Sequence, residues 1–154
     1  MAYKKTRKTN KVPLLSEFLF FGSFAFLDQW CKFFIRTYTD FTYYIIEPWI
    51  GWEYLGNEGV AFGLPVPNKV LIVITPIILF FLSYFFLQQK KPSKKFCIGY
   101  ILILGGALSN FIDRILFGLT IDYFRFITSV FNIADIMIVA GAILLVLEEY
   151  HNKK

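Results

Sequence analysis

Residues 70–87 read VLIVITPIILFFLSYFFL and contain no charged side chain. At 1.5 Å per residue, a helix of this length just crosses a hydrocarbon core that is about 30 Å thick. Three more apolar stretches of similar length lie at residues 18–35, 96–112 and 130–147. None of the four shows the period-two alternation of a barrel strand, so helices are expected to satisfy the backbone. The sequence therefore predicts an all-α membrane protein, a bundle of four transmembrane helices.

The composition agrees with a membrane protein and bounds its size. The chain has 154 residues, of which 56% are hydrophobic and 20% aromatic, which is too apolar for an ordinary soluble domain. We expect one integral membrane domain over residues 1–154, with spans at about 14–36, 69–88, 96–112 and 130–148. The outer connections, 37–68 and 113–129, then form a small extracytoplasmic loop region with room for some β-structure. Large soluble domains and multi-domain enzymes are excluded.

Basic residues indicate the orientation of the chain in the membrane. Eleven of the 16 Lys and Arg residues precede the first stretch, link the second to the third, or end the chain: Lys4, Lys5, Arg7, Lys8, Lys11, Lys90, Lys91, Lys94, Lys95, Lys153 and Lys154. Residues 37–68 contain four acidic residues and no basic one. The positive-inside rule therefore places both termini in the cytoplasm.

The same charges bear on partners and processing. The formal charge of +5 lies in clusters that flank apolar stretches and lack interleaved aromatic residues, so no nucleic-acid partner is expected. Membrane lipids are the expected surroundings, and we expect a monomer.

No small-x-small cleavage site follows the basic start, so the first stretch is expected to be retained. Cys31 and Cys97 fall near opposite ends of their helices and are expected to be free thiols.

Charged side chains inside apolar stretches are candidate functional residues, because a carboxylate there costs at least about 2.5 to 3.5 kcal/mol. Asp28 and Lys32 lie four positions apart on one helix face, which favours an internal ion pair with a structural role. Asn110 and Asp113 also share a face. Arg114 is placed to neutralise Asp113, and a carboxylate so paired is poorly suited to proton exchange. A scaffold role is therefore expected for Asp113.

Asp122 and Asp135 form a second kind of candidate. Asp135 has no basic residue within four positions, and Asn132 precedes it by one helical turn, where it can cap the helix or orient the carboxylate. If the connection folds back, the two acids meet at the outer membrane boundary. Two close carboxylates share a proton, so that one acts as base on a water and the other as acid toward a leaving amine. This pattern fits aspartyl proteolysis, but also cation binding or proton relay.

Three alternatives stay open at the level of the residues. A small ion or proton-coupled carrier would use Asp28, Asp113 and Asp135 as a translocation path. An assembly factor would use the polar cluster only to set the register of the helices. If Asp113 replaced Asp122 as the working acid, the two acids would be 22 positions apart instead of 13.

Five short motifs occur in order along almost the whole chain. They are D-Q-x-x-K (Asp28, Gln29, Lys32), N-x-G-x-A-F (Asn57, Gly59, Ala61, Phe62), G-G-A-x-x-N-x-x-D-R (Gly105, Gly106, Ala107, Asn110, Asp113, Arg114), a V-D-F-type acid (Asp122) and F-N-x-A-D (Phe131, Asn132, Ala134, Asp135). In these motifs the chain resembles lipoprotein signal peptidase, or signal peptidase II, a family of aspartyl peptidases of bacterial inner membranes. One such motif can arise by chance, but five in this order are highly specific.

The resemblance implies that Asp122 and Asp135 are the catalytic dyad. It implies a polar pocket lined or supported by Asp28, Lys32, Asn57, Gly59, Asn110, Asp113, Arg114 and Asn132. The implied substrate is a prolipoprotein whose lipobox cysteine carries diacylglycerol, and the enzyme cuts just before that cysteine at the outer membrane face. No metal or organic cofactor is implied, and the single histidine, His151, has no ligand cluster around it in the sequence.

Several features depart from the pattern of the family. Ser109 stands where Gly is usual, Glu58 occupies a position that is usually small or polar, and Tyr123 replaces the common Phe. The connection from Asp122 to Asp135 is several residues shorter than the resemblance leads us to expect. The shortening puts the architecture of the outer loops in question.

Overall fold

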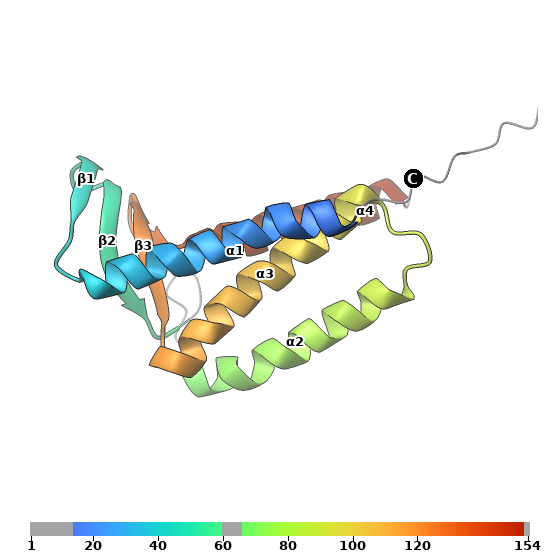
Figure 1. The fold of residues 1–154 in the computed structure, drawn as a ribbon, viewed down its shortest axis with the longest axis horizontal. Helices are drawn as coiled ribbons and strands as arrows, with labels where there is room; N and C mark the ends of the chain where they lie inside the picture. The colour runs from blue at the N-terminus through green and yellow to red at the C-terminus, as the bar shows by residue number, and fades with distance from the viewer. Residues whose placement is uncertain (1–13, 60–65, 153–154) are drawn as a thin grey trace, which may run out of the picture.

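The computed structural model describes residues 14–59 and 66–152 (Figure 1). Its elements follow in the order α1 (Leu14–Thr37), β1 (Tyr43–Ile46), β2 (Ile50–Asn57), α2 (Asn68–Gln88), α3 (Lys94–Phe117), β3 (Thr120–Phe126), β4 (Ser129–Phe131) and α4 (Ile133–Asn152). Three groups of residues named above lie outside the described ranges: the basic residues that precede the first stretch, Ala61 with Phe62, and Lys153 with Lys154.

Helices α1, α3 and α4 pack side by side, whereas α2 contacts α3 and diverges from the others (Figure 1). Glycines allow α3 and α4 to approach closely. A Cβ atom on Gly106 would lie 2.5 Å from the carbonyl oxygen of Ala134, and one on Gly141 would lie 2.6 Å from that of Gly99. Both positions therefore require glycine, and the short separation brings polar side chains of α3 to the start of α4.

The strands form one antiparallel sheet in the order β1-β2-β3-β4. The sheet lies at one end of the helices, while the α2–α3 link and the last turn of α4 lie at the other end (Figure 1). The connection of residues 37–68 supplies β1 and β2, and the residues after α3 supply β3 and β4. Pairing of β2 with β3 runs from Ile50 opposite Phe126 to Asn57 opposite Thr120, so it joins the two outer connections into one structure.

The prediction of an all-α bundle of four transmembrane helices with only a small loop region is wrong. The outer connections are rich in β-branched and aromatic residues, and they pair across a large sequence distance into four strands instead of forming loops. In the described ranges, only three helices are long and apolar enough to cross a membrane, at Leu15–Thr37, Asn68–Gln88 and Lys94–Phe117. Acidic residues near both ends of α4 leave an uncharged run, residues 136–147, that is only about 18 Å long.

Two turns place the strands next to the helices. Gly118 adopts the left-handed conformation, with φ of 77°, and ends α3 two residues before β3 begins. Only Ile127 and Thr128 separate β3 from β4, which explains the short connection between Asp122 and Asp135. The short connection thus forms a tight β3–β4 hairpin, and both acids lie next to the start of α4.

A small core lies between the C-terminal end of α1 and β3. It contains Cys31, Ile35, Ile121 and Tyr123, each at most 6% exposed. Both cysteines are free and buried, as expected. The side chain of Trp52 stacks on Tyr123 with ring centroids 5.1 Å apart, so this outer-loop aromatic belongs to the core.

Candidate active site

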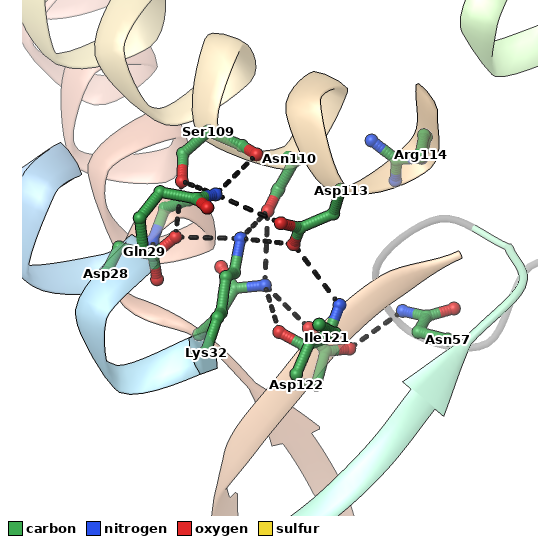
Figure 2. Close-up of polar contacts among 12 residues, drawn as sticks. Asp28, Gln29, Lys32, Asn57, Ser109, Asn110, Asp113, Arg114, Ile121 and Asp122 are labelled. Atoms are coloured by element: carbon green, nitrogen blue, oxygen red, sulfur yellow. Dashed lines mark hydrogen bonds and ion pairs between the residues drawn. The ribbon is translucent and has the colours of Figure 1, made fainter. Parts of the chain in front are cut away.

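The ammonium group of Lys32 is the centre of a buried polar cluster between α1 and α3 (Figure 2). Its Nζ lies 2.7 Å from Asp28 Oδ2 and 2.8 Å from Asp113 Oδ2, and it donates to Asn110 Oδ1 at 2.8 Å. The expected ion pair of Asp28 with Lys32 is confirmed, and a second carboxylate joins it. All three charged side chains are at most 1% exposed, so each is costly to bury unless the others neutralise it.

Asp113 is held by three donors from two elements, α1 and β3. Besides Lys32, Gln29 Nε2 donates to its Oδ1 at 3.0 Å, and the backbone N–H of Ile121 donates to its Oδ2 at 3.3 Å. Its ion pair is therefore with Lys32, not with Arg114 as the sequence suggested, because α1 packs against the face of α3 that carries Asp113. A carboxylate with this many donors and no exposed surface fits the expected scaffold role.

Asp28 likewise accepts hydrogen bonds on both of its carboxylate oxygens. Ser109 Oγ donates to its Oδ2 at 2.6 Å, while the hydroxyl of Tyr123 and the backbone N–H of Ala134 donate to its Oδ1 at 2.9 and 3.1 Å. The serine also accepts from Gln29 Nε2 at 2.9 Å. Two of the residues that depart from the family pattern, Ser109 and Tyr123, thus supply hydroxyl groups that this cluster uses.

Asp122 lies on β3 and is 1% exposed, yet it has no ion-pair partner among the described residues. Asn57 Nδ2 donates to its Oδ2 at 2.9 Å, and Asn132 Nδ2 donates to its Oδ1 at 2.6 Å. Burial and the nearby charge of Asp135 raise the pKa of Asp122 to about 7, although the two amide donors oppose the shift. Asp122 can therefore hold or release a proton near neutral pH.

Asp135 and Asn132 cap the start of α4 reciprocally. The backbone N–H of Asp135 donates to Asn132 Oδ1 at 2.8 Å, and the backbone N–H of Asn132 donates to Asp135 Oδ2 at 3.4 Å. Asn110 Nδ2 donates to Asp135 Oδ1 at 2.8 Å. Of the two alternatives for the Asn132 side chain, the helix cap is the one present. Its amide group donates to Asp122 and its backbone N–H to Asp135, so one residue donates hydrogen bonds to both acids.

A cleft of about 330 Å³ leads to Asp135 from the side of α2. Its walls are mostly apolar and come from Leu71, Ile74, Thr75, Ile78 and Leu79 of α2, Ile103 and Ala107 of α3, and Ile138 and Val139 of α4. Asp135, Asn110 and Arg114 are the polar residues at its end besides Thr75. Asp135 is half-buried, so it is reachable from this cleft in a way that Asp28 and Asp113 are not.

Arg114 presents an incompletely satisfied guanidinium group in the cleft. The side chain is 9% exposed, and its Nη2 donates to the carbonyl oxygen of Gly59 at 3.3 Å. Its buried Nε has no hydrogen-bond partner in the described part of the chain. The backbone N–H of Gly59 donates to Asn57 Oδ1 at 2.9 Å, so these residues connect Arg114 to Asp122.

The structure brings all ten predicted site residues into one connected network: Asp28, Lys32, Asn57, Gly59, Asn110, Asp113, Arg114, Asp122, Asn132 and Asp135. Gln29, Ser109 and Tyr123 also belong to it and were not chosen as site residues. Gln29 could have been predicted as a site residue, because it lies beside Asp28 and three residues before Lys32. Residues 14–59 and 66–152 contain no group of three or more His, Cys, Asp or Glu side chains suited to a metal ion.

Comparisons with known proteins identify the family. Residues 20–151 match the family model described as signal peptidase (SPase) II. The chain is similar to a lipoprotein signal peptidase of Caldanaerobacter subterraneus, at 38% identity over 79% of this chain and 86% of the relative. It is also similar to one of Pasteurella multocida, at 33% identity over 88% and 90%. A solved structure of a bacterial membrane enzyme superimposes with a TM-score of 0.77 at 29% identity, over 92% of this chain and 91% of that one. This chain, with its motifs assembled around one buried polar network, belongs to the signal peptidase II family.

Proposed function

We propose that the chain is an aspartyl endopeptidase that removes signal peptides from diacylglyceryl-modified prolipoproteins, by cutting before the lipidated cysteine. The observation that carries the proposal is the pairing of Asp122 and Asp135 through Asn132, at the end of an apolar cleft. Membership of a peptidase family provides the reaction class, and the two carboxylates provide groups that can perform it.

The mechanism requires one proton on the pair. The ionised carboxylate removes a proton from a water molecule as the water oxygen attacks the carbonyl carbon of the scissile peptide. The protonated carboxylate gives its proton to the amide nitrogen of the cysteine as the C–N bond breaks. The pair regains its starting state when the products leave, because one carboxylate has gained a proton and the other has lost one. Asp122, with a pKa of about 7, is able to supply either state near neutral pH.

The cleft indicates how the substrate reaches the acids. Its apolar walls between α2 and the α3–α4 pair suit the apolar part of a signal peptide and the acyl chains on the cysteine. Arg114 and Asn57 have donors close to the acids and are placed to hold carbonyl oxygens of the substrate backbone or the lipid ester. This arrangement lets a substrate enter sideways from the membrane and bring its scissile bond to Asp135.

We place the chain in the bacterial inner membrane as one membrane domain, with the sheet at the outer face. Lys90, Lys91, Lys94 and Lys95 lie around the α2–α3 link, at the end of the molecule opposite the sheet, which fits the positive-inside rule (Figure 1). Tyr43 and Trp49 on the sheet side are 61% and 50% exposed, as suits aromatic residues at headgroup level.

The carrier alternative has no support. Asp28 and Asp113 share one lysine in a buried cluster, and Asp135 lies on the same side of the molecule, so the three acids do not form a path across it. Matches to curated relatives are to lipoprotein signal peptidases.

Incubation of the purified protein with a diacylglyceryl-modified lipobox peptide tests the function directly. We expect one cut, immediately before the modified cysteine, and no cut in the same peptide with an unmodified cysteine. Asp122→Asn and Asp135→Asn should abolish the cut while both variants accumulate in the membrane as folded protein. Cleavage by either variant at the normal rate would show that the two acids are not the catalytic pair.

A further inference from the structure

We propose that Tyr123 is a positioning residue, whose hydroxyl sets the place of Asp135 relative to Asp122 by tying strand β3 to the start of helix α4. The inference rests on the proposed function of the two acids and adds a residue that the motifs do not assign. Tyr123 directly follows Asp122 in β3, so the two side chains point to opposite faces of the strand. One therefore belongs to the site and the other to the core beneath it.

The hydroxyl of Tyr123 joins three elements. It donates to Asp28 Oδ1 on α1 at 2.9 Å, and it accepts from the backbone N–H of Ile133, the first residue of α4, at 3.1 Å. Because Asp28 is an ion-paired carboxylate, the hydroxyl proton is committed to it, and the oxygen lone pairs face α4. The hydrogen bond to α4 lies two residues before Asp135.

Each of the first four backbone N–H groups of α4 has a defined acceptor. The N–H of Ile133 donates to Tyr123 and that of Ala134 donates to Asp28, while the N–H of Asp135 donates to the Asn132 side chain. The N–H of Ile136 reaches the backbone carbonyl of Asn132 at 3.4 Å. A helix start normally leaves these groups to water or a single cap. Here acceptors from β3 and α1 hold the turn that carries Asp135.

The ring of Tyr123 has little freedom to move. The side chain is 1% exposed and stacks on Trp52 with an interplanar angle of 21°. Since Asp122 and Tyr123 are adjacent in β3, a shift of this strand moves the acid and the hydroxyl that anchors α4 together. The hydroxyl thus links the position of Asp122 on β3 to that of Asp135 on α4. Catalysis is sensitive to small changes in the distance between two reacting groups.

The test is Tyr123→Phe, which keeps the ring and its stacking but removes the hydroxyl. We expect kcat for the lipidated peptide to fall by about 10-fold to 100-fold with KM little changed, and the alkaline limb of the pH profile to move, because the charge of Asp135 acts on Asp122 at an altered distance. Tyr100→Phe is the matched control, since it removes a hydroxyl that bonds Ser83 between α2 and α3 at 3.0 Å. The control should keep kcat and the pH profile.

Outcomes separate a positioning role from a structural one. A lower melting temperature with normal kcat per folded molecule and an unmoved pH profile would overturn the inference. If Tyr123→Phe does not accumulate, Ile133→Pro decides when it is compared with Ile133→Val. Proline is favoured at the first helical position and removes the N–H that donates to the hydroxyl, whereas valine keeps this N–H and only shortens the side chain that packs on the core. Ile133→Pro should lower kcat in the same way relative to Ile133→Val, and a normal kcat would reject the inference. Activity in Asp122→Asn or Asp135→Asn would instead reject the proposed function itself.

Discussion

Two groups of carboxylates lie next to each other in this molecule and differ in whether a cation neutralises them. Asp28 and Asp113 share Lys32, are fully buried, and accept hydrogen bonds on both oxygens. Asp122 and Asp135 have only amide donors, and Asp135 opens onto a cleft. A neutralised acid serves as scaffold, and an acid that lacks a countercharge but has access to substrate can exchange protons.

Removal of a carboxylate from the second group should have the largest effect on activity. Asp122→Asn and Asp135→Asn keep the shape of the side chain but cannot exchange a proton, so the rate of peptide cleavage should fall by about 10³-fold or more. Stability should change much less than activity, because asparagine still accepts one of the two hydrogen bonds that each carboxylate accepts, and no buried cation loses its partner. The measurement is cleavage of the lipidated peptide beside thermal unfolding of the same preparations. If the loss of activity were fully explained by a loss of folded protein, the two groups of carboxylates would not differ in role.

Disruption of the first group should instead act on folding. Lys32→Met leaves Asp28 and Asp113 buried without their shared cation, and we expect a loss of about 3 to 5 kcal/mol in the free energy of unfolding. Unfolding of the purified protein in detergent micelles measures the loss. Lys91→Met, at an exposed lysine of the α2–α3 link, is the control and should change stability by less than about 0.5 kcal/mol. A normal stability for Lys32→Met would mean that the cluster is not a structural centre.

The pH dependence of cleavage sharpens the comparison. Since the pKa of Asp122 is raised to about 7, a rise in pH through this value removes the proton that the pair must hold, and kcat/KM should then fall by about 10-fold per pH unit. In Asp135→Asn the neighbouring negative charge is gone, so the pKa of Asp122 should fall. Infrared absorption of the protonated carboxyl group can follow this shift in the inactive variant. An unchanged pKa would show that the two acids do not interact.

The smallest expected effect concerns the cleft. Ala107→Leu adds three carbon atoms to the cleft wall and should raise KM for the lipidated peptide by about 10-fold with little change in kcat, because even one methylene group in an apolar pocket alters fit by about 1 to 3 kcal/mol. Leu108→Ala, at a neighbouring position that is 41% exposed and outside the cleft, should leave both constants near normal. A KM that is insensitive to Ala107→Leu would place the substrate elsewhere.

Some contacts of the site could be predicted because they lie within one turn of one helix. Asp28 with Lys32, and Asn132 with Asp135, are set by spacings of four and three residues, and both interactions are present. The partner of Asp113 could not be predicted, since it depends on which face of α3 meets α1. The same limit applies to Tyr123, whose hydroxyl is useful only because α4 begins beside it.

The sheet was underestimated for a related reason. Strand β2 of the 37–68 connection pairs with β3, whose residues follow about 70 positions later, so no local signal showed that two loops would form one structure. The membrane prediction failed at α4 because acidic residues near both of its ends shorten its uncharged run, a feature that the window of residues 130–147 concealed.

The sequence by itself determined the apolar helices, the family motifs and the local pairs, because hydrophobic length and helical spacing act between near neighbours. Tertiary structure alone decided which acids are neutralised and which stay available. That choice depends on a lysine from α1, on amides from β2, α3 and the residue before α4, and on a glycine-lined approach of α3 to α4. The energy of a charge depends on all groups within a few ångströms, however distant they are in the chain.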